Sequence, residues 1–507
     1  MRGAFLSIVS SSLVCLSFGE ASAEVWSFVG SRYQAMGGAG VAVVDDSLAS
    51  YWNPAALAYM KGWDLQLPVT MNYSIENDAL HDLGEILATA DGLGSVIDAI
   101  DAGTPISNPD MITLLSALKN VPTLGVNGQS MAGNIAFGLT GHIGRIGIGA
   151  LSHNNASVRP VYDRGAGVAL SNAMSNILGG ATPGLEMDTG LSGQIAGIGG
   201  ITATEASQFV YLAEQAGFDT SDADQRQLLI DIATETDAAT STLNQGQALG
   251  ADVRGLSTQE FGISYGHPLP VPFYEPLDRR IAVGGVLKYM VGVSYFTFVD
   301  YGAGDDVNDI IDEAFDFDNT RTSHDVGLDL GLLAQPWDWL RVGMVARNVN
   351  SPTFSRSGPG EFELEPQVRV GVAAMPIKHW IVATDIDLTN NSSLRVPGFD
   401  SRIWSLGTEY TLPIPIVTLI LRAGGNVNVA EGQNNSFGLS GGVGLRFGNF
   451  LLDLSAGGAF DDEDFATSAT SGESIPSRLN VGLNLSWQSR PEGTRRRTGQ
   501  FDSVEAL

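Results

Sequence analysis

Apolar and polar residues alternate with a period of two along most of the second half of the chain, from residue 259 to residue 487. In residues 341–347, Val342, Met344 and Ala346 fall on one face, while the other face carries two arginines and a glycine. This repeat is typical of transmembrane barrel strands, which turn an apolar face to lipid and a polar or glycine face to the lumen. We therefore predict an all-β transmembrane barrel of about 14 antiparallel strands, with 12 or 16 as the alternatives.

The same alternation occurs twice before this region. Residues 63–73 form a candidate first strand, with Leu65 on the apolar face and Gln66 on the polar face. Pro68 interrupts it, and proline is tolerated in a strand only at an edge or a bulge. Residues 133–151 read as a hairpin with a glycine-containing turn.

A soluble β-sandwich would also alternate, and three observations separate it from a membrane barrel. The alternation recurs over about ten segments, as membrane barrels require. The chain begins with what reads as an export signal, described below. Aromatic residues also stand near the segment ends, as interface girdles do; they are Trp337, Trp339, Trp380, Tyr410, Phe447, Phe460 and Trp487.

Two stretches change to a helical period of three and four residues, at about 77–120 and 166–251. In the second, Thr202 and Glu205 have the spacing of a capping box, and Gly217 is a candidate helix stop. We expect both stretches to be helical insertions in loops of the barrel. Two interpretations stay open for the second: a helical cap over an opening, or a module at about 202–245 that docks an envelope protein partner.

The first 23 residues have the composition of a secretory signal. A basic start and a short apolar run precede Ala21-Ser22-Ala23, an A-x-A cleavage pattern. We expect residues 1–23 to be removed, a barrel over residues 63–489, and a basic tail over residues 490–507.

Charge and composition narrow the function. The formal net charge is −29, which argues against nucleic acid as a partner. This acidic charge suits external loops that contact lipopolysaccharide, with divalent cations between the two. The chain has one cysteine, which lies within the signal, so disulfide and thiolate chemistry are not expected. Its 62 glycines exceed what a globular enzyme usually has and suit tightly packed strands with short turns.

The stretch behind the signal carries a motif with glycine-rich turns, two adjacent acids and an Asn-Pro pair. It resembles the N-terminal plug of the FadL-type family of outer-membrane barrels. The matching segments are Ala35 to Ala42, Asp45-Asp46 and Asn53 to Leu57, and the motif residues are Gly37, Gly38, Gly40, Asp45, Asp46, Asn53 and Pro54. The resemblance implies a plug over residues 24–62 inside the lumen, and it favours 14 strands.

Two further segments, residues 340–354 and 385–391, look like parts of the TraF-like conjugal transfer branch of that family, which also includes PorV-like proteins. The resemblance leaves two functions open. The first is a plugged channel for hydrophobic or amphipathic small molecules. The second is a non-transporting envelope protein that acts in assembly, anchoring or conjugal transfer. We expect an outer-membrane location in a Gram-negative-type bacterium for both.

Motifs for catalysis and metal binding are weak. Two G-x-S-x-G matches surround Ser264 and Ser440, but both serines stand inside alternating strands rather than at a strand-to-helix turn. The stretch Gly37 to Gly40 lacks the third glycine of a nucleotide-binding loop, because Val43 stands at that position. The six histidines are scattered without a paired spacing. We expect no enzyme activity, no cofactor and no metal site.

Charged residues fall repeatedly on the predicted inner face of the strands. Charges that face a lumen must pair or be hydrated. We expect Asp45 and Asp46 of the plug to meet arginines of this set, and the alternative is a simply hydrated lumen. The candidate lumen-facing residues are Arg341, Arg347, Arg369, Asp385, Asp387, Arg422, Arg446 and Arg478.

Overall fold

The computed structural model describes residues 25–76, 108–109, 112, 115–116, 130–162, 189–198, 201–234, 249–271, 277–300, 320–356, 361–393, 399–414, 416–430, 437–459, 462–464 and 474–489. The predicted signal (1–23), the basic tail (490–507) and most of the first helical insertion (77–120) lie outside these ranges.

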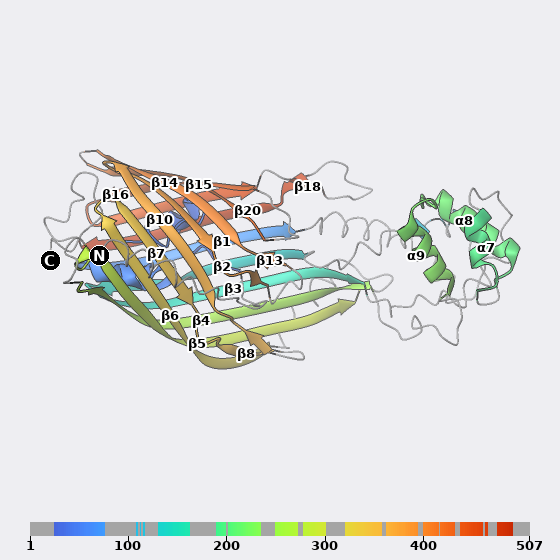
Figure 1. The fold of residues 1–507 in the computed structure, drawn as a ribbon, viewed down its shortest axis with the longest axis horizontal. Coiled ribbons are helices and arrows are strands. Elements are labelled where there is room, and N and C mark those ends of the chain that lie inside the picture. The colour runs from blue at the N-terminus through green and yellow to red at the C-terminus, as the bar shows by residue number, and fades with distance from the viewer. Residues whose placement is uncertain are drawn as a thin grey trace, which may run out of the picture.

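A closed antiparallel barrel of 14 strands forms the body of the protein (Figure 1). This confirms the predicted fold and strand number. In order around the barrel, the strands are β1 (Trp63–Glu76), β2 (Ser130–Ile143), β3 (Ile146–Tyr162), β4 (Leu249–Leu269), β5 (Ile281–Asp300), β6 (Thr320–Trp337), β7 (Leu340–Arg347), β10 (Gln367–Ile377), β11 (Trp380–Asp387), β14 (Ile403–Pro413), β15 (Thr418–Asn428), β16 (Phe437–Phe447), β17 (Phe450–Ala459) and β20 (Arg478–Ser489).

The first and last strands close the barrel, because β1 pairs with β20 from Trp63 opposite Ser489 to Ser74 opposite Arg478. The pairing of β1 with β2 has a gap at Leu67 and Pro68, which agrees with the expected disruption by a proline that lacks an N–H.

Burial follows the predicted alternation along the strands. In β1, exposed and buried residues alternate strictly from Trp63 to Met71. The exposed set is apolar, as at Leu330, Val342 and Val481, whose exposed fractions are 49%, 37% and 42%. A barrel that is apolar outside and polar inside is a transmembrane barrel. Among the described helices, none is long and apolar enough to cross a membrane.

The two ends of the barrel differ. At the end where β1 starts and β20 stops, which we call the turn end, short turns join β2 to β3, β6 to β7, β10 to β11 and β16 to β17. The opposite end, the loop end, carries the long connections. Three small hairpins occur there: β8 (Thr353–Ser355) with β9 (Glu361–Glu363), β12 (Asn391–Ser392) with β13 (Asp400–Ser401), and β18 (Asp462–Asp464) with β19 (Ser474–Pro476).

A helical unit is inserted between β3 and β4 and lies beyond the loop end in Figure 1. It contains α7 (Thr189–Ile195), α8 (Ala203–Gln215) and α9 (Ala223–Thr234). The predicted capping box at Thr202 and Glu205 is present, and Gly217 follows α8 with a φ of 88°. Leu115, from the insertion after β1, is buried in the core of this unit. The two predicted insertions therefore share one hydrophobic core.

Candidate functional site in the barrel lumen

Residues 25–62, which we call the lumen segment, are packed against the inner faces of the strands, and nearly all of them are buried. The segment forms α2 (Ser31–Ala35), α3 (Ala49–Trp52) and the 3-10 helix η1 (Pro54–Tyr59). Trp52 is fully buried at its centre, and its indole N–H donates to the carbonyl oxygen of Val29 at 2.9 Å. The rings of Trp26, Tyr33 and Tyr51 lie 4.9 to 6.1 Å from that of Trp52.

Glycine shapes the first turn of the lumen segment. Gly37 has a φ of 66°, and a Cβ there would lie 2.5 Å from the backbone nitrogen and oxygen of Gly425 in β15. Gly38 also has a positive φ and faces the ring of Phe28. A Cβ on Gly40 would overlap Trp52, so the absence of a side chain here allows packing within the segment.

Asn53 and Pro54 set the last turn. Asn53 accepts a hydrogen bond from the Ala55 N–H at 3.1 Å, which caps η1, and Pro54 takes the first helical position. The Asn53 amide also donates to the carbonyl of Leu332 in β6 at 3.1 Å. The Asn53 side chain therefore caps η1 and also forms a hydrogen bond with the wall.

The inner face of the wall is shaped to the lumen segment by glycine. At many inward positions an added Cβ would meet the segment, so the backbones approach closely. This close approach accounts for part of the high glycine content. These wall glycines include Gly147, Gly266, Gly284, Gly331, Gly343, Gly371, Gly407, Gly424, Gly442 and Gly482.

Polar groups of the wall hold the backbone and side chains of the segment. The Asp385 carboxylate accepts the N–H groups of Gly40 and Val41 at 2.7 and 2.9 Å. The hydroxyl of Ser264 lies 2.7 Å from that of Ser50. The Ser440 hydroxyl accepts the Gly37 N–H at 3.1 Å. Both serines of the G-x-S-x-G matches thus form hydrogen bonds with the lumen segment.

Arg32 is the main ionic link between the segment and the wall. Its guanidinium pairs with Asp45 of the segment and with Glu409 of β14. Glu409 in turn pairs with Arg422 of β15 at 2.9 Å, and Arg422 pairs with Asp453 of β17. Five charges from one segment and three strands therefore form one buried network.

The acids of the segment differ from the prediction in their partner. We expected arginines of the wall, but Asp45 and Asp46 pair with Arg32, with Asp46 3.5 Å away. Asp46 also accepts the Tyr33 hydroxyl at 2.8 Å and the Leu48 N–H at 3.0 Å. The lumen segment therefore supplies the counter-charge of its own acids, because Arg32 belongs to it.

Burial and neighbouring charges shift the pKa values of Asp46, Tyr33 and Arg32. Desolvation raises the pKa of Asp46 to about 6, although the positive charge of Arg32 opposes the shift. Burial also raises the pKa of Tyr33 well above its usual value, and the Asp46 carboxylate adds to the effect. Desolvation by itself would lower the pKa of Arg32, but Asp45 and Glu409 more than offset it and the pKa lies above its usual value.

A second ionic network surrounds Arg347 of β7. Its guanidinium lies 3.4 Å from Glu260, and Lys288 lies 3.1 Å from Asp329 and 3.4 Å from Glu260. The Arg347 guanidinium also sits 4.0 Å from the ring centre of Tyr51 in the lumen segment. Cation–π contact therefore joins this network to the segment.

Arg369 of β10 is completely buried. Its Nε lies 3.3 Å from Asp387, and its guanidinium carbon lies 5.4 Å from the ring centre of Trp26. Arg347 lies 5.3 Å from the same ring. Two wall arginines thus contact Trp26 at the start of the lumen segment.

The remaining candidate arginines occupy different levels of the lumen. Arg341 is buried 5.8 Å from the ring centre of Tyr59, near the turn end. Arg446 is half-buried close to the last residues of β16. Arg478, at the loop end, pairs with Glu76 at 3.1 Å. Within the described ranges, no group of three or more His, Cys, Asp and Glu side chains could hold a metal ion.

The sequence patterns did not indicate Arg32 and Trp26, which both contact charged residues of the wall. A signal was available for Arg32, because it stands alone as a cation before an apolar, glycine-rich stretch. Trp26 carries no comparable signal.

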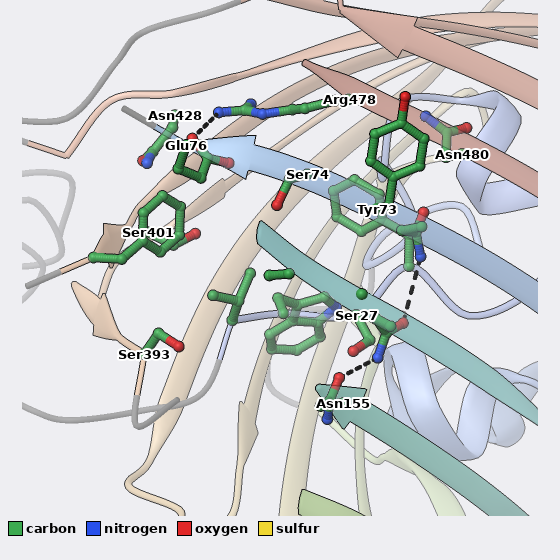
Figure 2. A pocket seen from close by; sticks show the side chains of 18 of the residues that line it. Ser27, Tyr73, Ser74, Glu76, Asn155, Ser393, Ser401, Asn428, Arg478 and Asn480 are labelled. Carbon is green, nitrogen blue, oxygen red and sulfur yellow. Dashed lines mark hydrogen bonds and ion pairs between the residues drawn. The ribbon is translucent and has the colours of Figure 1, made fainter. Parts of the chain in front are cut away.

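A pocket of about 180 Å³ remains between the first residues of the lumen segment and the loop-end half of the wall (Figure 2). Trp26 and Phe28 line it from the segment, and β1, β2, β14, β15 and β20 contribute the wall. Figure 2 shows Ser393 and Ser401 on one side of this pocket and Tyr73 and Asn480 on the other.

Comparison with solved structures finds outer-membrane transporters. The toluene transporter TbuX of Ralstonia pickettii is 12% identical, with 91% of this chain and 98% of that chain covered and a TM-score of 0.42. The toluene transporter TodX of Pseudomonas putida is 10% identical, with coverage of 92% and 99% and a TM-score of 0.43. A FadL homologue of Pseudomonas aeruginosa is 10% identical, with coverage of 92% and 99% and a TM-score of 0.42. At such scores these likenesses carry no argument about function.

A search of curated protein sequences found no match. A family model does match: the one described as "F plasmid transfer operon, TraF, protein" fits residues 50–387, which is more than half of the chain. The match starts within the lumen segment and runs to the end of β11. The chain therefore belongs to the family of the F plasmid transfer operon TraF protein.

Proposed function

We propose that this protein is an outer-membrane channel for hydrophobic or amphipathic small molecules, with the lumen segment as its plug. The loop end would face the cell exterior and the turn end the periplasm, because membrane barrels carry short turns on the periplasmic side. Lipid and lipopolysaccharide would surround the apolar outer face.

Aromatic residues support this placement. Around the turn end, Trp63 and Trp487 have exposed fractions of 38% and 59%, and their rings lie 6.5 Å apart. Trp337 and Trp339, in the turn from β6 to β7, stack at 5.8 Å and are also exposed. Exposed tryptophans at one level of a barrel are typical of a membrane interface.

The observation that carries the channel proposal is how the segment is held. Its polar contacts with the wall run through side chains, as at Arg32, Asn53 and Asp385, whereas the strands pair with each other through backbone ladders. Apolar residues of the segment also pack against wall residues such as Leu333 and Ala373. Water can replace such polar contacts one by one. The lumen segment could therefore leave the lumen or shift within it while the ring of paired strands stays intact.

The experiment is removal of residues 25–62 from the mature protein, followed by conductance measurements in planar bilayers and dye uptake into liposomes. We expect the deleted barrel to assemble, to keep heat-modifiable migration on gels and to conduct more than the full chain. The matched control is deletion of residues 189–234, a segment of similar length outside the barrel, which should leave conductance unchanged. An assembled barrel with unchanged conductance after removal of residues 25–62 would rule out the plug.

A second candidate is an envelope component that transports nothing, in assembly, anchoring or conjugal transfer. The family match and the separate core of the helical unit favour it. In the source bacterium, deletion of residues 189–234 should then lower conjugal transfer or envelope assembly while the barrel still reaches the outer membrane. If that deletion has no effect and removal of residues 25–62 opens the barrel, the channel function holds alone.

A further inference from the structure

We propose that the turn end of the barrel binds the headgroups of anionic phospholipids in the leaflet that faces the periplasm. Arg145, Arg279 and Lys378, which we call the turn-end cations, would make the contacts. The inference goes beyond the channel function, because it needs only the orientation given above and holds whether or not a solute passes through the lumen. It is supported by the depth of the short turns, by the sign of their charge and by the lack of acidic partners for these cations.

Exposed apolar side chains set the depth of the short turns. Ile143 and Ile146 flank the turn from β2 to β3, with exposed fractions of 78% and 55%. The other three short turns are flanked in the same way by exposed pairs, which are Trp337 and Trp339, Ile377 and Trp380, and Phe447 and Phe450. Exposed apolar and aromatic residues of this kind border the hydrocarbon layer. The polar residues at the tips of these turns therefore lie at the level of the lipid headgroups.

The tips and the neighbouring connection carry the turn-end cations. Arg145 lies in the turn from β2 to β3, Lys378 lies in the turn from β10 to β11, and Arg279 comes shortly before β5. Arg279 and Lys378 are exposed, and Arg145 is half-buried. Long side chains at such positions can place their charged ends among headgroups while their carbon stems stay against apolar surface.

Few acids oppose these cations. The described connections at the turn end contain two acids: Asp338, which pairs with Arg280 at 2.7 Å, and Asp278, which accepts the N–H of Val271 at 2.8 Å. No ion pair joins a turn-end cation to another residue that the structure describes. With Lys61 and Arg280 included, five cations face two acids at this end.

This excess of positive charge runs against the composition of the chain. The whole sequence has 27 Lys and Arg against 56 Asp and Glu, so a net positive end is not expected from composition alone. The sequence that follows Ser489, the last residue of β20, adds four arginines and one acid within residues 490–497. Cations are therefore concentrated at one end of an otherwise acidic protein.

Phospholipid headgroups match these cations in chemistry and in position. A guanidinium can donate two parallel hydrogen bonds to a phosphate, and a lysine ammonium pairs with it as a point charge. Lys and Arg residues close to an anionic membrane surface each add to the attraction. An acidic soluble partner would also be attracted, but the flanking isoleucines and tryptophans place the cations at the membrane surface. This position favours lipid.

The test is electron spin resonance of the full chain in phosphatidylcholine vesicles with a trace of spin-labelled phosphatidylglycerol or phosphatidylcholine. The immobilised fraction of each label reports the lipid in contact with the barrel. We expect phosphatidylglycerol to associate about twofold more strongly at low salt, and this preference to fall at high salt, because salt screens exposed charges. The triple variant Arg145→Gln, Arg279→Gln and Lys378→Gln should lose most of the preference, and Lys378→Gln alone should lower it.

Arg321→Gln is the matched control, because it removes an exposed cation of β6 at the loop end. It should leave the preference unchanged, and heat-modifiable migration on gels verifies that each variant is folded. Equal association of the two lipids with the full chain would overturn the inference, and so would a preference that the triple variant and Lys378→Gln both retain.

Two further outcomes separate this inference from its alternatives. If the full chain shows no lipid preference but binds isolated cell-wall sacculi, and the triple variant does not, the cations serve the cell wall and the inference is wrong. If the lipid preference is found in a barrel that neither conducts nor takes up dye, the channel function fails while the lipid contact stands.

Discussion

Arg32 of the lumen segment and Glu409 of β14 form a two-pronged ion pair, with Nε to Oε2 at 2.8 Å and Nη2 to Oε1 at 3.1 Å. The two residues stand 377 positions apart in the chain. Both side chains are buried, and each has one further ionic partner, Asp45 for Arg32 and Arg422 for Glu409. This pair therefore connects the segment with a strand that is distant from it in the sequence.

Arg32→Ala should release the lumen segment. The change removes the guanidinium that pairs with the half-buried Asp45 and the buried Glu409, and breaking a buried pair from one side costs about 3–5 kcal/mol. We expect a lower free energy of unfolding in urea and flickering current steps in bilayers. Arg321→Ala, at an exposed position of β6, is the control and should change neither. If the Arg32 variant gives no flickering currents in bilayers, the pair does not hold the segment.

Asp46 should make stability depend on pH. Its pKa is about 6 in the folded protein and near 3.8 otherwise, so folding takes up a proton between these values and the contribution to stability falls as pH rises from about 4 to 6. Asp46→Asn copies the protonated form, and above pH 6 it should stabilise the protein by on the order of 3 kcal/mol.

The measurement for Asp46 is the free energy of unfolding in urea, for wild type and variant, at pH 4 and pH 7.5. The difference between the two proteins should be small at pH 4 and large at pH 7.5. Glu361→Gln, at an exposed position of β9, corrects for general charge effects. A difference that stays constant with pH would contradict the assignment.

Gly37 and Gly144 form a matched pair for testing the close contact of segment and wall. Both have a positive φ, of 66° and 54°, but an added Cβ meets Gly425 at the first position and nothing within 4 Å at the second. Gly144→Ala should cost only backbone strain, about 1 kcal/mol. Gly37→Ala should cost more and should also destabilise the closed state in conductance recordings. Equal effects on stability and conductance would mean that the contact at Gly37 can relax freely.

The outer face can be tested at Leu330, Val342 and Val481. Replacement of each by Arg should cost roughly 2–4 kcal/mol if the residue lies near the bilayer midplane. In addition, Val481→Cys should resist water-soluble maleimides in liposomes, while Asn480→Cys, its inward-facing neighbour in the pocket, should react. Rapid labelling of Val481→Cys would place this face in water.

The fold was predictable because membrane strands carry a local signal. The alternation at Arg341 to Arg347 or at Trp63 to Met71 follows directly from one face in lipid and one in the lumen. Strand ends were less predictable: the hairpin expected at 133–151 extends from Ser130 to Tyr162. Strands that continue past the apolar band are no longer constrained by lipid, so their ends carry no hydrophobic signal.

The lumen contacts were only partly predictable. Composition and alternation place Asp385, Arg369 and Arg422 on inner faces, but they do not choose partners. Arg32 took the role expected of the wall arginines because its helix places it beside Asp45 and Asp46 and within reach of Glu409. Such choices depend on which strands lie side by side across the barrel, and that information is not local in the sequence.

The helical unit sets an order for the building of the protein. Leu115, from the loop after β1, is buried in the same core as Phe209 of α8, and the Ser116 hydroxyl donates to the carbonyl of Ala216 at 3.4 Å. The whole β2–β3 hairpin lies between these contributions in the chain. Long-range contacts of this kind form only after the intervening chain is arranged. The helical core therefore closes after both loops have emerged on the same side of the barrel. The time at which α8 becomes resistant to protease would then mark the moment when the first three strands have passed.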